Sequence, residues 1–207
     1  MDAPKITLYV DINSATFAKC EVTYVPILLG GLMRACNNTP PINVKNKDKW
    51  INAERIRWAR YFSVPIANST PEGFPVRTLS VQRALGAISQ MAPEKLPSAI
   101  EALYRSFWVD RNSKIGEPEG FTPVLETVLG KQGTQDVLSA TSQPEIKGLL
   151  TANTDRAFRS GAFGLPWLEC TDANGKTEGF WGVDHLGQVA DFLSQDRSRD
   201  LGFKAVL

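Results

Sequence analysis

The sequence predicts an α/β fold in which one sheet is interrupted by a long helical insertion. Two apolar runs with strand-like alternation lie within the first thirty residues. Residues from about 48 to 161 follow helical spacing, and two further strand-like runs around an Asn-Gly turn come after them. The order strand, strand, helical block, strand, strand, helix indicates one sheet built from both ends of the chain.

The first two strands are expected at residues 6–10 and 22–27, where β-branched and aromatic residues dominate and Pro26 marks the end of the second run. Nine residues separate Asp11 from Glu21. Parallel neighbours need a crossover of about a dozen residues or more, usually a helix. The sequence therefore leaves two arrangements open: a parallel pair whose first crossover helix is missing or shortened, or a different pairing such as an antiparallel hairpin.

The middle of the chain is predicted to be helical. A glycine- and proline-rich stretch first supplies a short helical turn and an extended loop. The expected helices are 48–62, 79–91, 97–110, a helix with Thr122 as N-cap, Pro123 at its first position and Gly133 near its end, and 142–161. Strands at 167–171 and 178–181 follow, and Asp184 is expected to cap a last helix.

Composition excludes several function classes. The net charge of +1 gives no electrostatic footprint for nucleic acid or an anionic membrane. No apolar run is long enough to span a bilayer, and the N-terminus does not resemble a secretory signal. Three cysteines without a C-x-x-C pair favour a reducing, cytoplasmic location. A single histidine, His185, argues against a histidine-rich metal site, so no metal is expected.

Two segments carry a family resemblance. "RSGAFGLPWLE" and "NGKTEGFWGVDHLGQVADFL" together resemble the C-terminal part of kappa-class glutathione transferases, which are grouped with the 2-hydroxychromene-2-carboxylate isomerases and DsbA-like proteins. "VPILLGGLMRACNNTPP" and "WARYFSVPI" resemble earlier parts of the same family, so the resemblance covers residues 21–193.

The resemblance implies a thioredoxin-like sheet with an inserted all-helical domain. Residues 1–47 and 162–207 would form the thioredoxin-like domain, and residues 48–161 the insertion. It also implies a homodimer, glutathione as cosubstrate and a small-molecule electrophile as the second substrate. Mitochondrial or peroxisomal members make those compartments alternatives to the cytoplasm.

Glutathione-binding residues are implied at three places. Leu165 and Pro166 match the cis-proline position, where the backbone before the proline can pair with a tripeptide. Val183 and Asp184 match the γ-glutamyl position, although family members often carry serine or glutamine where this chain has Val183. Asn38 matches an asparagine near glutathione, and by itself it also reads as a turn residue.

The catalytic serine of the family has one candidate here, Ser14. Asp11-Ile12-Asn13-Ser14 satisfies the family's Asp-x-x-Ser, and a hydroxyl there would donate to the glutathione sulfur. The residues after Ser14 depart from the family pattern. In a second alignment, "NSATFAKCEVTYV" is the loop that enters the second strand, the helix is absent, and Ser14 matches by coincidence.

Three functions follow as expectations. The leading one is a kappa-class-type glutathione transferase that activates the thiol for attack on an electrophile. A glutathione-dependent isomerase of the 2-hydroxychromene-2-carboxylate type uses the same site. A catalytically inactive binding or scaffold protein is the third, motivated by the short first connection. Phe107 and Trp108 could line an apolar substrate pocket, but we expect them to lie in the helical core.

Overall fold

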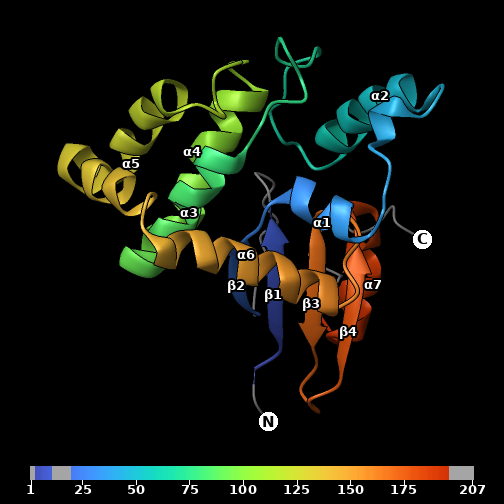
Figure 1. The fold of residues 1–207 in the computed structure, drawn as a ribbon. Helices are drawn as coiled ribbons and strands as arrows, with labels where there is room; N and C mark the ends of the chain where they lie inside the picture. Colours follow the sequence, from blue (N-terminus) through green and yellow to red (C-terminus); the bar gives the residue numbers. More distant parts are fainter. Residues whose placement is uncertain (1–2, 11–19, 196–207) are drawn as a thin grey trace.

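A four-stranded mixed sheet forms the lower half of the molecule (Figure 1). The structure is a computed structural model and describes residues 3–10 and 20–195. The strands are β1 (Lys5–Val10), β2 (Glu21–Pro26), β3 (Trp167–Thr171) and β4 (Thr177–Trp181), in the order β2-β1-β3-β4. β1 is parallel to β2 and antiparallel to β3, and β3 is antiparallel to β4.

The parallel pairing of β1 and β2 decides between the two arrangements that the sequence left open. The register runs from Lys5 beside Glu21 to Val10 beside Pro26, so the antiparallel hairpin is wrong. Parallel pairing brings the carboxyl ends of both strands to one edge, where α1 (Leu29–Ala35) buries Leu32. The expected missing or shortened helix would fall within residues 11–19, which lie outside the described residues.

Alternation along the strands gives each sheet face its own core. One face buries Ile6, Leu8, Leu168 and Cys170 against α7 (Leu186–Phe192) and the helical block. The opposite face buries Tyr9, Val25 and Trp167 against α6 (Pro144–Arg159). Figure 1 shows α6 crossing this face of the sheet.

The helical block shares its core with the first of these faces. Its other helices are α2 (Lys47–Tyr61), α3 (Leu79–Met91), α4 (Leu96–Trp108) and α5 (Pro118–Ala140), with 3-10 turns at Pro41–Asn43 and Pro93–Lys95. Val81, Leu85 and Ile88 of α3 are fully buried at helical spacing. Because Phe107 is also buried in this core, it is a packing residue and not a pocket lining. The division into two domains at residues 48 and 162 stays a prediction.

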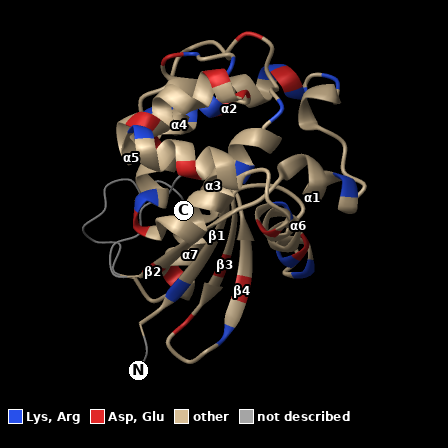
Figure 2. Cartoon of the chain, turned by 60° about the vertical axis from the view of Figure 1, so that its left-hand side comes forward, with Lys and Arg blue, Asp and Glu red and all other residues tan. Residues whose placement is uncertain are grey.

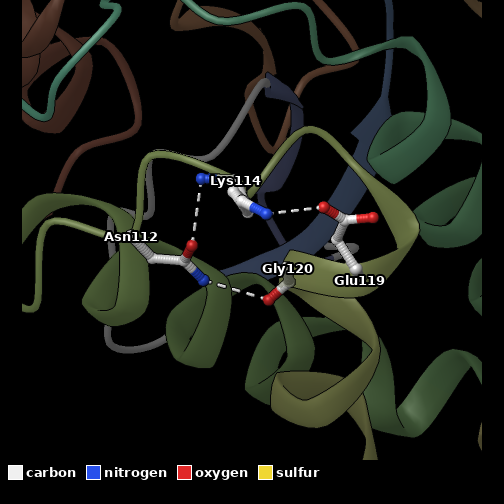
Figure 3. A network of polar contacts seen from close by, with 4 residues as sticks. All are labelled: Asn112, Lys114, Glu119 and Gly120. Atoms are coloured by element: carbon white, nitrogen blue, oxygen red, sulfur yellow. Dashed lines mark hydrogen bonds and ion pairs between the residues drawn. The ribbon is translucent and has the colours of Figure 1, made fainter.

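The start of α5 corrects the expected helix boundary. Thr122 does not cap this helix, because α5 begins at Pro118, five residues before the expected first position at Pro123. Figure 3 shows the contacts that hold this first turn: Asn112 Nδ2 donates to the carbonyl oxygen of Gly120 at 3.0 Å, and Lys114 Nζ lies 2.8 Å from Glu119 Oε1. Contacts with the loop just before the helix therefore accompany a start that the Thr-Pro pattern does not predict.

The predicted end near Gly133 lies close to a break in α5, which consists of two helical stretches and ends at Ala140. The interruption lies at Gly130, whose φ of 72° is left-handed and accessible to glycine at little cost. Thr134 Oγ1 donates to the carbonyl oxygen of Gly130 at 2.8 Å and covers one backbone acceptor at the kink.

Helix α2 is the least buried long helix of the block. Only Ala59 of its residues is buried, and Trp50 is strongly exposed. Arg55 anchors the helix, since its Nη1 donates to the carbonyl oxygen of Ala67 at 2.9 Å and its guanidinium lies over the Trp108 ring. Figure 2 shows basic and acidic residues interspersed along α2 and α6. Within the described residues, no helix is long and apolar enough to cross a membrane.

Candidate functional site at the carboxyl edge of the parallel strands

Three loops from distant parts of the sequence meet at one edge of the sheet. β1 and β2 both end there, β3 begins there and β4 ends there, because Tyr9 pairs with Val25 and Trp167, and Trp167 pairs with Trp181. Ligands of open α/β sheets bind outside the carboxyl ends of parallel strands. The segment after α1, the loop before β3 and the turn after β4 therefore form the candidate site.

The loop before β3 carries the Leu165–Pro166 pair. The bond between these residues is cis, as the resemblance implies. The carbonyl oxygen of Pro166 accepts a hydrogen bond from Gly182 N at 3.0 Å, which ties this loop to the end of β4. The neighbouring N–H and C=O of Leu165 have no hydrogen-bond partner among residues 3–10 and 20–195. They are backbone groups that a peptide-like ligand can use.

Asn38, in the segment after α1, is hydrogen-bonded to the loop before β3. Its Nδ2 donates to the carbonyl oxygen of Phe163 at 3.0 Å, and its backbone N–H donates to Met33 at 2.8 Å. Two residues earlier, Cys36 Sγ donates to the carbonyl oxygen of Ala162 at 3.4 Å. The structure thus brings Asn38 beside the loop that carries Leu165 and Pro166.

Val183 and Asp184 follow β4 in a short 3-10 turn, Val183–His185. The prediction that Asp184 caps the last helix is wrong. The residue before α7 is His185, and no side chain caps this helix. The Asp184 carboxylate instead folds back over Gly182, where a Cβ would collide with Oδ1. Gly182 also has a φ of 89°, so this turn requires glycine.

The Asp184 carboxylate is half exposed and 3.4 Å from His185 Nδ1. This contact is not a hydrogen bond, because His185 Nδ1 has no hydrogen-bond partner in the described part of the chain. The carboxylate is therefore available to a cationic group of a ligand. Ser14, the candidate thiol activator, lies outside the described residues.

The sequence alone did not single out two aromatic residues at this site. Phe163 and Trp181 are 42% and 43% exposed, and their ring centroids are 5.0 Å apart. Phe163 also contacts the ring of Trp167, whose Nε1 donates to Ser160 Oγ at 3.0 Å. The position of an aromatic residue directly before Gly182, on an edge strand, was the pattern that could have identified Trp181.

The three cysteines differ in their surroundings. Burial raises the pKa of the Cys170 thiol to about 12, which makes it a packing residue. Burial also raises the pKa of Cys20. Cys36 is half-buried and borders the candidate site through its bond to Ala162.

A shallow cavity of about 330 Å³ lies elsewhere, between α2 and the loop after it. Ile56, Arg60, Ser63 and Asn68 are among its lining residues. None of the predicted site residues lines it. The hydrogen bonds and strand ends described above are therefore the better guide to the site than this cavity.

The fold and the site define the class of protein. The sequence profile of the DSBA-like thioredoxin domain matches residues 6–194, nearly the whole chain. The chain belongs to this family.

The narrower relationship comes from individual relatives. Glutathione S-transferase kappa 2 of Caenorhabditis elegans is 30% identical over 187 residues, which cover 86% of this chain and 80% of that protein. Glutathione S-transferase kappa 1 of Rattus norvegicus is also 30% identical, over 82% of this chain and 76% of its own length. The resemblance noted in the sequence is therefore confirmed.

Solved structures show the same fold. A 2-hydroxychromene-2-carboxylate isomerase matches with a TM-score of 0.74 at 16% identity, covering 92% of this chain and 94% of that one. The cytosolic disulfide reductase DsbM of Pseudomonas aeruginosa, solved with GSH, matches with a TM-score of 0.57 at 13% identity, covering 92% and 96%. The predicted thioredoxin-like fold is confirmed.

Proposed function

We propose that this chain is a glutathione transferase that binds reduced glutathione at the carboxyl edge of the sheet and directs its thiolate to an electrophilic carbon. The observation that carries the proposal is the convergence of Asn38, Leu165 and Asp184 on one edge. Two hydrogen bonds hold them there, Asn38 to Phe163 and Gly182 to Pro166. The kappa-class relatives support glutathione as the cosubstrate.

Each group has a chemical task in this proposal. The cysteinyl part of glutathione pairs with the backbone N–H and C=O of Leu165 as a short strand addition. The Asp184 carboxylate pairs with the α-ammonium of the γ-glutamyl end, which is a charge-assisted contact. The exposed Asn38 side chain adds an amide oxygen that its bond to Phe163 leaves free to accept.

The reaction needs a thiolate, since the thiol itself is a weak nucleophile. The sulfur of bound glutathione forms a bond to the electrophilic carbon, the leaving group departs with its electron pair, and the thiol proton goes to solvent. The Ser14 hydroxyl is the candidate donor that holds the sulfur as a thiolate. Within this proposal the second substrate is a small-molecule electrophile, and two chains form a homodimer.

Initial-rate assays test this function with 1-chloro-2,4-dinitrobenzene, an activated aryl chloride. The rate above the uncatalysed reaction should depend on glutathione and fall in Asp184→Asn through a higher KM for glutathione. Ser14→Ala should lower kcat with little change in that KM. Unchanged turnover in Ser14→Ala would remove Ser14 from the mechanism and leave the binding residues in place.

An isomerase is the second candidate, favoured by the fold shared with the 2-hydroxychromene-2-carboxylate isomerase. Glutathione would then add to a conjugated substrate and leave again after bond rotation, so it would be regenerated. Incubation of a 2-hydroxychromene-2-carboxylate with catalytic glutathione separates the two. Stoichiometric loss of thiol indicates transfer, and product without loss of thiol indicates isomerisation. Glutathione binding without either reaction would favour the inactive binding protein.

A further inference from the structure

Two exposed aromatic rings adjoin the loops that form the candidate site. Phe163 lies two residues before Leu165, and Trp181 lies three residues before Asp184. Their rings are tilted by 50° with centroids 5.0 Å apart. Large aromatic side chains are usually well buried, so an exposed pair at a candidate site requires a reason.

The pair is fixed in position by its neighbours. Phe163 is held through its carbonyl oxygen by Asn38, and its ring contacts Trp167, which is itself buried and bonded to Ser160. The indole of Trp181 lies against Gly164, where a Cβ would approach Nε1 to 2.7 Å. Each ring is thus packed against a neighbour, which limits the side-chain freedom that a ligand contacting the pair would have to remove.

The indole N–H adds a polar group to this surface. Within the described ranges 3–10 and 20–195, Trp181 Nε1 has no hydrogen-bond acceptor. An indole nitrogen can only donate, so a ligand that covers the ring gains by presenting an acceptor at its edge. A planar, apolar ligand with oxygen acceptors matches these properties.

The aromatic pair has the size of a small-ligand contact. A stable protein interface buries about 800 Å² on each side, far more than two rings that are each less than half exposed. Phe163 belongs to the loop that carries Leu165, and Trp181 ends the strand that leads to Asp184, so both rings come from segments of the proposed glutathione site.

We propose that Phe163 and Trp181 form the subsite for the second substrate, and that they select planar aromatic electrophiles with oxygen acceptors. The inference rests on the proposed function, because the aromatic group reaches this surface as part of a glutathione conjugate or beside bound glutathione. Trp181 is a specificity-determining residue here and takes no part in activating the thiol.

Equilibrium binding tests the subsite separately from catalysis. Reduced glutathione and S-(2,4-dinitrophenyl)glutathione are titrated by calorimetry into the wild-type chain and its variants. The conjugate should bind at least about tenfold more tightly than glutathione, because the aryl group adds aromatic contact. Trp181→Ala should remove most of this preference and leave the glutathione Kd within about twofold, since it loses only the ring contact.

Two further variants complete the experiment. Trp181→Phe keeps an aromatic ring and should keep most of the preference, which guards against a folding defect in Trp181→Ala. Trp50→Ala removes an exposed tryptophan of α2 and should change neither Kd.

Three outcomes overturn the inference: equal affinity of the wild type for both ligands, a preference that survives in Trp181→Ala, or an equal loss of both affinities in that variant. Binding of glutathione without the preference overturns the subsite alone. Binding of neither ligand overturns the proposed function as well.

Discussion

Asn38 Nδ2 donates a hydrogen bond to the carbonyl oxygen of Phe163, at 3.0 Å and across 125 residues of sequence. The bond joins the segment after α1 to the loop before β3. It places the one asparagine implied in glutathione binding beside Leu165, whose backbone is the other half of the proposed peptide-binding surface. The geometry of the site therefore depends on a hydrogen bond between two segments that are far apart in the sequence.

Asn38→Ala should weaken glutathione binding more than it weakens the fold. The hydrogen bond is exposed, so its loss should lower the free energy of unfolding by about 1 kcal/mol or less. The Kd for glutathione should rise about five- to tenfold, because both the amide and the position of the Phe163 loop change. Calorimetric titration and urea unfolding measure the two effects.

Asn153→Ala is the matched control for Asn38. Its Nδ2 donates to the carbonyl oxygen of Pro26 at 3.1 Å, across 127 residues, so it joins α6 to the last residue of β2 and not to one of the three site loops. It should cost similar stability and leave the glutathione Kd unchanged. Identical effects of the two variants on binding would show that Asn38 has no special part in the site.

Substitution by alanine should change the free energy of unfolding in opposite directions at two glycines, Gly148 and Gly179. Gly148 lies inside α6 with open space around its Cα, so Gly148→Ala should raise the free energy of unfolding by about 0.5–1 kcal/mol. A Cβ on Gly179 would collide with the ring of Trp167. Since that ring is buried and bonded to Ser160, Gly179→Ala should destabilise by about 1–3 kcal/mol. Urea unfolding of both variants tests this, and a neutral Gly179→Ala would contradict the packing described for β3 and β4.

Cys170 should resist alkylation in the folded chain. Burial raises the pKa of its thiol to about 12, so the thiolate is scarce at pH 8 and its sulfur is inaccessible. Iodoacetamide should modify the half-buried Cys20 and Cys36 first, and Cys170 only after unfolding. Mass spectrometry of the digested protein measures each site, and early modification of Cys170 would contradict its burial.

The raised pKa of the Cys170 thiol makes the free energy of unfolding depend on pH. The thiol ionises near its ordinary value of 9.0 when unfolded and near 12 when folded. Its contribution to stability is therefore complete below pH 9 and is lost as the pH rises from 9 toward 12, because the unfolded chain releases the proton first. Cys170→Ala should flatten this part of the stability curve.

Tyr9→Phe should be tolerated although Tyr9 is fully buried. The Tyr9 hydroxyl has no hydrogen-bond partner of good geometry in the described part of the chain. Burial is the main cause that raises its pKa, and the nearby Arg156 and Ser160 only partly offset it. Removing this hydroxyl should change the free energy of unfolding by less than about 1 kcal/mol, whereas Tyr9→Ala should cost about 3–5 kcal/mol through the cavity it leaves. Urea unfolding distinguishes them, and a large loss in Tyr9→Phe would indicate that the hydroxyl is bonded.

The sheet and most helices were predictable because their signals are local. Alternation at residues 6–10 and helical spacing at residues 79–91 are read directly from the side chains. The boundaries of α5 were not predictable. The Thr122-Pro123 start pattern is strong locally, but the helix begins at Pro118, Phe121 is buried, and Asn112 donates to Gly120 from the preceding loop.

The candidate site was predictable only through resemblance. No spacing rule relates Asn38 to Phe163, because their contact depends on the parallel pairing of β1 and β2. The short turn at Asp184 was missed for a related reason, since a residue suited to an N-cap also suits a 3-10 turn. The exposure of Trp181 follows from its place at the end of an edge strand, which the sheet order defines.

Calorimetric titration of the folded chain with reduced glutathione tests the central claim most directly. The site described here predicts binding in the micromolar to low-millimolar range, and about tenfold weaker binding in Asp184→Asn through loss of a charge-assisted contact. No binding by a chain whose circular dichroism and cooperative unfolding show a native fold would contradict the account, because the edge formed by Asn38, Leu165 and Asp184 would then not be a glutathione site.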